Sequence, residues 1–338
     1  MAKETKTDPD APYLKQVQDV AFRPIFILGR ARSGTTILHQ LLAQSANFNY
    51  LSVYHVVHHR EILANHLTGR ADAVRAEMAA AFKAMRLEDR EIDHMGVTPD
   101  TAEEYGFILH SAHYPATFNY TGPRFIRPFK RFMVNDYNRD LFLNLARKVQ
   151  YTSDPAKPIL FKNPADYLNF PYLHQLIPHA KFVFIHRHPV HVMNSQIKTF
   201  REVTARRNAY YALIDPTYAA LHDNPLRLYA ARLFADSQSS FKRIALARNA
   251  HQILSHYIQN IGAFDPSCYI AIRYEDLMAD PTAVTGRIFN FLGITPQAPL
   301  TFDLIKPRNV KLLPELQKHY DQICDILQTD MAFHGYTR

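Results

Sequence analysis

Short apolar runs alternate with amphipathic stretches along most of this chain. Strands are predicted where the residues are almost all apolar, at about residues 24–29, 158–162, 181–186 and 269–273. Helices are predicted from helical periodicity and end signals at about residues 37–46, 70–91, 140–149, 167–176, 190–201, 225–260, 280–292 and 314–327. Such alternation is typical of a parallel sheet that helices cover on both faces. The pattern therefore predicts an α/β fold of three layers, with a mostly parallel central sheet flanked by helices.

Two parts of the chain lack this regular alternation. We predict that residues 1–20 form a flexible N-terminal arm. Residues 21–338 contain no internal repeat, low-complexity tract or interdomain linker, so we predict a single domain. Within it, we expect residues 50–150 to form an irregular and partly helical insertion, in which the segment 105–137 is aromatic, basic and contains prolines.

Composition narrows the class of protein. The 338 residues are 47% hydrophobic and 21% charged, which is ordinary for a globular protein with a sizeable core. Cys268 and Cys324 are two cysteines far apart, which argues against a disulfide framework and suits a reducing compartment. No apolar run approaches the roughly 20 residues of a membrane span, and residues 1–10 are unlike a secretory signal. We therefore expect a cytoplasmic protein without a transmembrane segment, whose oligomeric state stays open.

The net charge of +8, with histidines neutral, favours an anionic ligand. Nucleic acid is the usual first hypothesis for a protein this basic. The basic residues are spread along the chain, however, without a run or a recognisable nucleic-acid module. We therefore expect no nucleic-acid partner.

The stretch from Gly29 to Thr36 carries the most specific signal. An apolar strand ends at Gly29, a short polar loop follows, and a helix then begins. Gly29 and Gly34 have the spacing of a phosphate-binding loop, in which backbone amides and a helix N-terminus hold an anion. Nucleoside triphosphate chemistry requires a lysine at position 35, but this chain has Thr35, and its cation is Arg32. The loop therefore predicts a phosphate site and disfavours an ATP-dependent kinase.

Further cations and hydroxyls follow the other predicted strands. Arg187 ends the third strand, and Ser195 lies about two helical turns later, so both can face the edge where parallel sheets bind ligands. Together they suit a second phosphate, although a surface arginine and a helix serine would look the same. Lys162 ends the second strand, and Tyr274 follows the fourth, where it either serves the site or anchors the strand. Lys306 lies in a basic loop, residues 304–309, before the last helix.

These pieces form an ordered set: Gly-x-x-Arg-Ser-Gly-Thr-Thr, Lys-Asn-Pro, His-Arg-x-Pro with a later serine, and Arg-Tyr-Glu-Asp-Leu. The set resembles the sulfotransferases that use 3′-phosphoadenosine 5′-phosphosulfate (PAPS), with motifs closest to their bacterial and protein-tyrosine branches. The resemblance covers about residues 24–309 and is much weaker over 45–160. It implies a P-loop NTPase-like topology.

The resemblance also implies a role for each motif. In the family the first loop binds the 5′-phosphosulfate of the donor, which implicates Arg32, Ser33, Gly34, Thr35 and Thr36. The second motif binds the 3′-phosphate, which implicates Arg187 and Ser195. Tyr274 and Lys306 match donor-contacting residues of the protein-tyrosine branch, and Lys162 matches its catalytic lysine.

The function so implied is in-line transfer of a sulfuryl group from PAPS to a hydroxyl acceptor, in preference to an amine. This transfer needs no metal ion or triphosphate, which explains why position 35 is not lysine. It needs cations around a charge-spread transition state, a role for Arg32 and Lys162. Two alternatives are a P-loop-type nucleotide kinase and a nucleotide-binding module without catalytic activity.

The acidic residue that the family often carries about 20 residues after the loop is absent. That region reads Leu-Ser-Val-Tyr-His, which makes His55 the nearest candidate for the base that takes the acceptor proton. A partly buried structural histidine is the alternative. His55, His58 and His59 share helical spacing, but no carboxylate-bearing zinc signature accompanies them, so we expect no metal site.

The segment 105–137 is the predicted acceptor region because it is irregular and aromatic. Its rings could line a pocket or belong to the core. Its basic residues could favour an anionic acceptor or form a solvated face; they are Arg124, Arg127, Lys130 and Arg131. The class of acceptor thus stays open among a small molecule, a lipid, a saccharide and a peptide.

Overall fold

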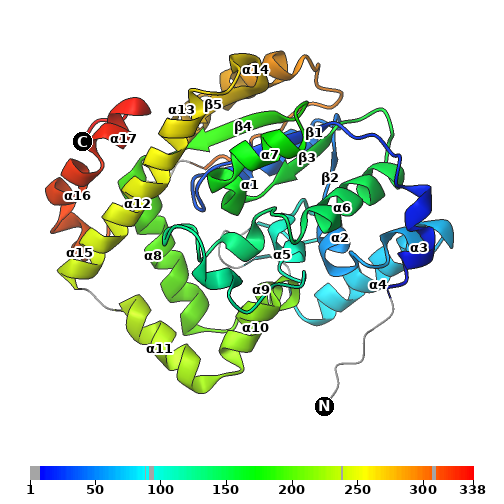
Figure 1. Cartoon of the computed structure of the whole chain (residues 1–338), viewed down its shortest axis with the longest axis horizontal. Helices are drawn as coiled ribbons and strands as arrows, with labels where there is room; N and C mark the ends of the chain where they lie inside the picture. The colour runs from blue at the N-terminus through cyan, green and yellow to red at the C-terminus, as the bar shows by residue number, and fades with distance from the viewer. Residues whose placement is uncertain (1–7, 88, 91–94, 237–238, 307–309) are drawn as a thin grey trace.

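A five-stranded parallel sheet forms the centre of the computed structural model (Figure 1), which describes residues 8–87, 89–90, 95–236, 239–306 and 310–338. The strands lie in the order β2-β3-β1-β4-β5. Their bounds are β1 Pro24–Leu28, β2 Asn49–Tyr50, β3 Ile159–Lys162, β4 Lys181–His186 and β5 Tyr269–Arg273. Because all neighbouring strands are parallel, their carboxyl ends meet at one edge of the sheet.

Helices cover the sheet and build most of the insertion between α1 and β3. The α-helices are α1 Thr35–Gln44, α2 Val53–Val57, α3 Ile62–Leu67, α4 Ala71–Ala84, α5 Gly106–Leu109, α6 Arg139–Tyr151, α7 Phe170–Leu176, α8 Pro189–Ala205, α9 Ala209–Ile214, α10 Pro216–His222, α11 Pro225–Asp236, α12 Ser240–Ile261, α13 Tyr274–Ala279, α14 Pro281–Leu292, α15 Pro314–Gln317, α16 Tyr320–Ile326 and α17 Gln328–Phe333. The 3-10 helices are η1 Ala11–Gln16, η2 Phe118–Tyr120, η3 Lys130–Phe132, η4 Pro164–Leu168 and η5 Pro266–Cys268. Within the described residues, no helix is both long enough and apolar enough to cross a membrane.

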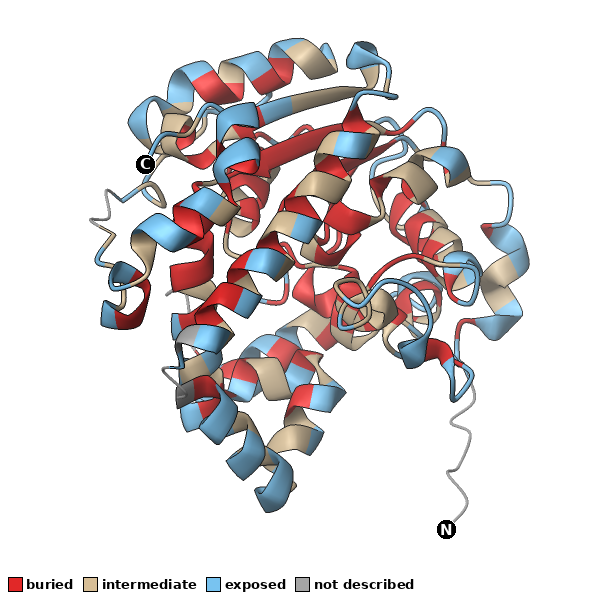
Figure 2. Ribbon diagram, turned by 60° about the vertical axis from the view of Figure 1, so that its left-hand side comes forward, coloured by how far each residue is buried: buried red, intermediate tan, exposed pale blue. Residues whose placement is uncertain are grey.

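Alternate side chains of β1 point into two separate parts of the core. Ile25 and Ile27 pack with apolar residues of α1 and α14 on one face. Phe26 packs on the other face with residues of α6, α7 and α12, and its ring stacks on Phe161 at 5.7 Å and on Phe182 at 5.5 Å. Burial on both faces explains why the strands read as continuous apolar runs. The predicted three-layer α/β fold is confirmed, and Figure 2 shows the buried residues gathered on the sheet and the helix faces that cover it.

Most predicted elements occur where the sequence pattern places them. The four predicted strands correspond to β1, β3, β4 and β5, whereas β2 was not predicted because two residues carry no measurable periodicity. The single helix predicted over 225–260 is wrong: α11 ends at Asp236 and α12 begins at Ser240, after a serine-rich stretch of the sequence. The last predicted helix is likewise divided into α15 and α16.

The predicted N-terminal arm lies outside the described residues up to residue 7. From residue 8 onward it is packed against the insertion. Asp10 is fully buried, with its carboxylate 2.7 Å from Lys148 Nζ of α6, and it accepts a hydrogen bond of 2.8 Å from the amide of Ala64 in α3. These contacts hold Asp10 against α3 and α6.

Candidate active site

The loop between β1 and α1 has a backbone that only glycine permits at two positions. At Gly29, a Cβ atom would lie 2.4 Å from the carbonyl oxygen of Ile185. At Gly34, where φ is +104°, a Cβ atom would lie 2.5 Å from the ring of Tyr274. Gly34 caps α1, so the first unpaired amides of that helix lie at the carboxyl edge of the sheet. Arg32 also has a positive φ of 76°, which non-glycine residues seldom adopt.

We expect Gly34→Ala to lower the free energy of unfolding by about 1–3 kcal/mol and to weaken nucleotide binding at least about tenfold, because the loop must move. Gly122→Ala is the matched control, since Gly122 has a φ of +78° but nothing within 4 Å of its added Cβ. Denaturant unfolding and calorimetry with adenosine 3′,5′-bisphosphate measure both effects. Equal losses of binding in the two variants would contradict the role given to the loop.

A cavity of about 230 Å³ opens beside this loop. Its lining residues are Arg32, Gly34, Thr35, Thr36, Ile37, Met95, Arg187, Tyr274, Asp303, Leu304 and Lys306. The folded chain thus brings together most of the donor-site residues predicted from the sequence. Ser195 lies one contact away, because its Oγ accepts a hydrogen bond of 3.1 Å from Arg32 Nε. Ser33 is buried, and its amide donates to the carbonyl oxygen of Arg30 at 2.9 Å, which stabilises the turn.

Among the described residues, three cations and one carboxylate line this cavity, so it suits a polyanion. Arg187, directly after β4, donates through Nη1 to the carbonyl oxygen of Arg32 at 3.2 Å. Its guanidinium lies 4.3 Å from the ring centroid of Tyr274, directly after β5. The contact orients Arg187 by a cation–π interaction, and it explains why a tyrosine follows β5. The remaining part of the basic loop, residues 307–309, lies outside the described residues.

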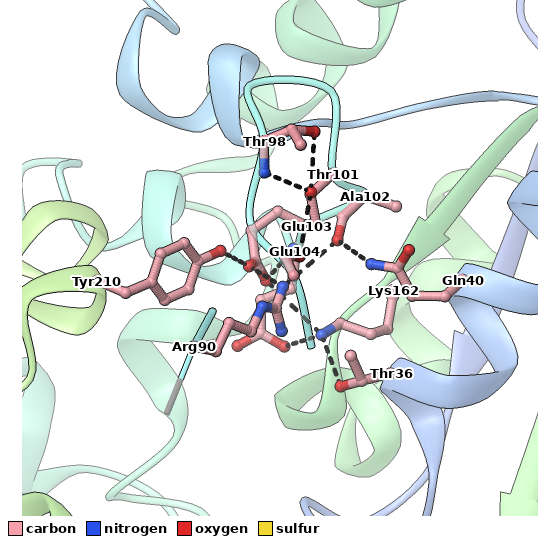
Figure 3. A network of polar contacts seen from close by, with 11 residues as sticks. Thr36, Gln40, Arg90, Thr98, Thr101, Ala102, Glu103, Glu104, Lys162 and Tyr210 are labelled. Atoms are coloured by element: carbon pink, nitrogen blue, oxygen red, sulfur yellow. Dashed lines mark hydrogen bonds and ion pairs between the residues drawn. The ribbon is translucent and has the colours of Figure 1, made fainter. Parts of the chain in front are cut away.

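Lys162 ends β3 beside the same loop and is almost completely buried. Its Nζ lies 3.1 Å from Glu104 Oε2, 3.4 Å from Thr36 Oγ1 and 3.7 Å from Glu103 Oε1. Figure 3 shows this lysine between the start of α1 and the two carboxylates. The ammonium group is therefore held where the phosphate loop and an acidic pair meet.

Sequence reasoning missed Glu103 and Glu104. Glu103 accepts hydrogen bonds from Arg90 and from the hydroxyl of Tyr210, and one of 2.8 Å from the amide of Glu104. Burial by itself raises the pKa of Glu103, but Arg90 and Lys162 hold it below its ordinary value. Burial raises the pKa of Glu104, and Lys162 only partly opposes this. Two adjacent carboxylates with pKa values shifted in opposite directions are a recognised sign of acid–base function.

His55 lies elsewhere in the insertion. It is buried, and its Nδ1 accepts a hydrogen bond of 3.0 Å from the amide of Ser52, which caps α2. Burial, together with Arg75, lowers its pKa to about 3. In the part of the chain that the structure describes, His55 lines neither the cavity beside the phosphate loop nor the cavity beside Glu104. The two neighbouring histidines have local partners: Glu61 for His58, and the carbonyl oxygen of Val56 for His59.

A second cavity of about 230 Å³ lies on the Glu104 side of Lys162. Its wall is mainly aromatic and aliphatic, with Phe107, Phe129, Phe132, Tyr167, Leu168, Tyr211 and Ile253. The neighbour of Lys162 in the chain, Asn163, also contributes to it. The cavity is therefore a mainly apolar site that reaches the carboxyl edge of the sheet.

The aromatic segment 105–137 serves both as lining and as core. Phe129 and Phe132 line the apolar cavity, whereas Tyr114 and Phe118 are buried. Three of its basic side chains have local partners: Lys130 donates to the carbonyl oxygen of Phe118 at 2.8 Å, Arg131 donates to Asn119, and Arg127 donates to a backbone carbonyl. These contacts give Arg127, Lys130 and Arg131 a structural role in their own segment.

The fold defines an α/β protein with a P-loop-like topology, and a cation-lined cavity opens beside the loop after β1. Residues 24–298 match the sulfotransferase family, and this chain belongs to that family. The resemblance inferred from the motifs is thereby confirmed.

Curated relatives and solved structures agree with this assignment. Omega-hydroxy-beta-dihydromenaquinone-9 sulfotransferase Stf3 of Mycobacterium bovis is 24% identical over 286 residues, which are 81% of this chain and 64% of that protein. The same values hold for Stf3 of Mycobacterium tuberculosis, so this chain spans under two thirds of the length of these relatives. The crystal structure of sulfotransferase STF9 from Mycobacterium avium matches 97% of this chain and 81% of its own, with a TM-score of 0.60 and 16% identity. The crystal structure of sulfotransferase STF1 from Mycobacterium tuberculosis H37Rv matches 97% of this chain and 78% of its own, with a TM-score of 0.53 and 17% identity.

Proposed function

We propose that this protein is a PAPS-dependent sulfotransferase (EC 2.8.2 class) that transfers a sulfuryl group in line to a hydroxyl acceptor, in preference to an amine. The observation that carries the proposal is the position of Lys162, whose Nζ lies 3.4 Å from Thr36 of the phosphate loop. Thr36 also lines the cavity that holds Arg32, Arg187 and Lys306. Lys162 and the cations of the cavity therefore both adjoin Thr36, where a sulfuryl group would leave its phosphate.

The cavity fits a donor that carries two separate anionic groups. The loop from Arg32 to Thr36 and the N-terminus of α1 would hold the 5′-phosphosulfate, with Ser33 shaping the turn. Arg187 and Ser195 would hold the 3′-phosphate, and Tyr274 and Lys306 would complete the site. Bound PAPS would supply an activated sulfuryl group with a phosphate as its leaving group.

During transfer, the acceptor oxygen forms a bond to sulfur while the bond from sulfur to the phosphate oxygen breaks. Arg32 and Lys162 neutralise the charge that grows on the sulfuryl oxygens and on the leaving phosphate. The acceptor proton passes to a base, and adenosine 3′,5′-bisphosphate and the sulfated acceptor are the products. This chemistry requires no metal ion.

We propose Glu104 as that base and keep His55 as the competing hypothesis. Glu104 lines the apolar cavity and lies 3.1 Å from Lys162, so a hydroxyl held there can approach both groups. His55 has Nδ1 engaged by Ser52, and its low pKa makes its imidazole a weak base. The geometry supports the carboxylate.

The apolar cavity supports an acceptor whose hydroxyl is carried on an aromatic or aliphatic body. Its aromatic wall would bind such a body, and Glu104 and Asn163 would orient the hydroxyl. The name of the Stf3 relatives specifies a dihydromenaquinone, an apolar acceptor of this kind. We propose an apolar acceptor of this class here, in preference to a saccharide or a peptide.

We also propose a cytoplasmic location for the protein, since both cysteines are free thiols.

The test is transfer of label from sulfur-labelled PAPS to hydroxylated quinones, sterols and phenols, followed by chromatography of the products. Labelled product that depends on the enzyme supports the proposal. Transfer of the γ-phosphate of ATP with Mg²⁺ would support the kinase alternative. Tight binding of adenosine 3′,5′-bisphosphate without turnover on any acceptor would support the inactive binding module.

Arg187→Ala is expected to weaken binding of adenosine 3′,5′-bisphosphate by about 1.5–3 kcal/mol, the usual loss for a charge-assisted phosphate contact. Adenosine 5′-phosphate lacks the 3′ group, so its affinity should fall far less. Calorimetry with both nucleotides measures the difference, and Arg139→Ala on the exposed side of α6 is the control. Equal losses for the two nucleotides would refute the assignment of Arg187 and Ser195.

A further inference from the structure

Helix α11 presents an apolar stripe to solvent. Leu226, Tyr229 and Leu233 are 83%, 63% and 57% exposed. With Ala230 they fall within about 100° of the helix circumference. The opposite side of α11 packs on α8, where Arg232 donates to the last carbonyl oxygens at 2.8 and 2.9 Å. Surface helices normally bury their apolar stripe, so a stripe turned outward marks a contact surface.

The stripe continues toward the apolar cavity beside Lys162. Phe234 at the end of α11 and Phe241 at the start of α12 are 56% and 80% exposed. Phe234 and Phe200 line a groove of about 180 Å³ between α8, α11 and α12. This groove shares Arg30 and Gln196 with the cavity that contains Glu104. The groove therefore adjoins the proposed acceptor site at Arg30 and Gln196.

The same region carries much of the positive charge of the protein. Residues 196–250 contain nine Lys and Arg against four Asp and Glu, although two of the nine, Arg201 and Arg243, form ion pairs with Glu315 of α15. Arg227 is exposed beside Leu226. Lys242 Nζ lies 3.5 Å from the ring centroid of Phe234 and is itself buried. Cations beside an exposed apolar stripe are typical of helices that lie in the plane of an anionic membrane surface.

We propose that α11 and the start of α12 dock this protein on an anionic lipid bilayer, so that an apolar acceptor enters from the bilayer along the groove. Figure 1 shows α11 at the lower tip of the molecule, away from the sheet, where a flat surface can reach it. A second copy of the chain is a poorer occupant. The 12-residue helix α11 is about 18 Å long and by itself offers less than the roughly 800 Å² per partner of a stable interface. The docking surface includes no residue of the proposed donor site.

The test is flotation of the protein with vesicles of phosphatidylcholine alone or with about 30% phosphatidylglycerol. The wild type should float with the mixed vesicles. The double variant Leu226→Glu/Leu233→Glu should lower the partition coefficient at least about tenfold, because two apolar contacts are replaced by repelled charges. Leu67→Glu/Met85→Glu is the matched control, since both residues are exposed but lie on or beside α3 and α4. Arg227→Gln should reduce only the binding that depends on phosphatidylglycerol.

Three outcomes would overturn the proposal: no vesicle binding by the wild type, equal binding by the α11 double variant, or equal loss in the control pair. Light scattering provides a further test. A dimer that dissociates in Leu226→Glu/Leu233→Glu would assign the stripe to a second copy instead. Calorimetry with adenosine 3′,5′-bisphosphate shows whether each variant is folded. Because it reads the donor site alone, it also separates failure of the docking proposal from failure of the proposed function.

Discussion

Lys162→Ala is expected to lower kcat by about 10²–10³ and to leave donor affinity within a few-fold of the wild type. Charge grows on the sulfuryl oxygens and the leaving phosphate only during transfer, so a cation directed there stabilises the transition state more than the bound donor. The position of Nζ at 3.4 Å from Thr36 Oγ1 supports this role. Steady-state kinetics and calorimetry with adenosine 3′,5′-bisphosphate measure the two quantities separately.

Removal of this lysine also leaves Glu103 and Glu104 without their shared cation, so thermal unfolding must accompany the kinetics. Lys162→Arg keeps the charge and should restore part of the stability. Lys157→Ala is the control, because Lys157 precedes the other end of the same strand and forms a surface ion pair with Asp154. A Lys162→Ala protein impaired only in donor binding, or a wild-type rate abolished by chelators, would contradict the assignment.

Glu104→Gln is expected to lower kcat by about 10²–10⁴, the usual range for loss of a general base. The amide keeps the shape of the side chain but cannot accept the acceptor proton. Glu77→Gln, on the exposed face of α4, is the matched control. Near-normal turnover of Glu104→Gln with the native acceptor would refute the role of Glu104.

The pH profile provides an independent test of the same residue. A base must be deprotonated, so activity is lost as the pH falls through its pKa in the folded enzyme. Burial raises the pKa of Glu104, so the acid limb of the wild-type kcat profile should lie above the ordinary pKa of a glutamate. Glu104→Gln should lack this limb.

His55→Ala separates the two hypotheses for the base. With Glu104 as the base, this variant should keep its turnover and lose about 1–3 kcal/mol of stability, because the buried amide of Ser52 loses its acceptor. With His55 as the base, kcat should fall by about 10²–10⁴ with little change in donor binding. A histidine base with an ordinary pKa gives an acid limb of the kcat profile near pH 6–7. Burial lowers the pKa of His55 to about 3, so His55 would not produce a limb in that range.

Local sequence pattern sufficed for the elements that depend on local physics. β1, β3, β4 and β5 are short apolar runs buried on both faces, and their period is visible in the residues themselves. The loop from Gly29 to Thr36 was recognisable from its two glycines, at positions where a Cβ atom would clash with neighbouring atoms. The α11–α12 break was missed, since helical periodicity on both sides hides a short interruption.

The sequence by itself thus determined the fold class, the phosphate loop and the cations that end the strands, because each is encoded in neighbouring residues. Only the tertiary structure decided the order β2-β3-β1-β4-β5 and with it which strand ends lie side by side. It alone brought Glu104, from a segment without regular periodicity, to within 3.1 Å of Lys162. In the tertiary structure, His55 is buried and accepts a hydrogen bond from the capping residue of α2, and Leu226 of α11 is exposed to solvent. Contacts between residues distant in the chain arise from packing and chain closure, which no local pattern records.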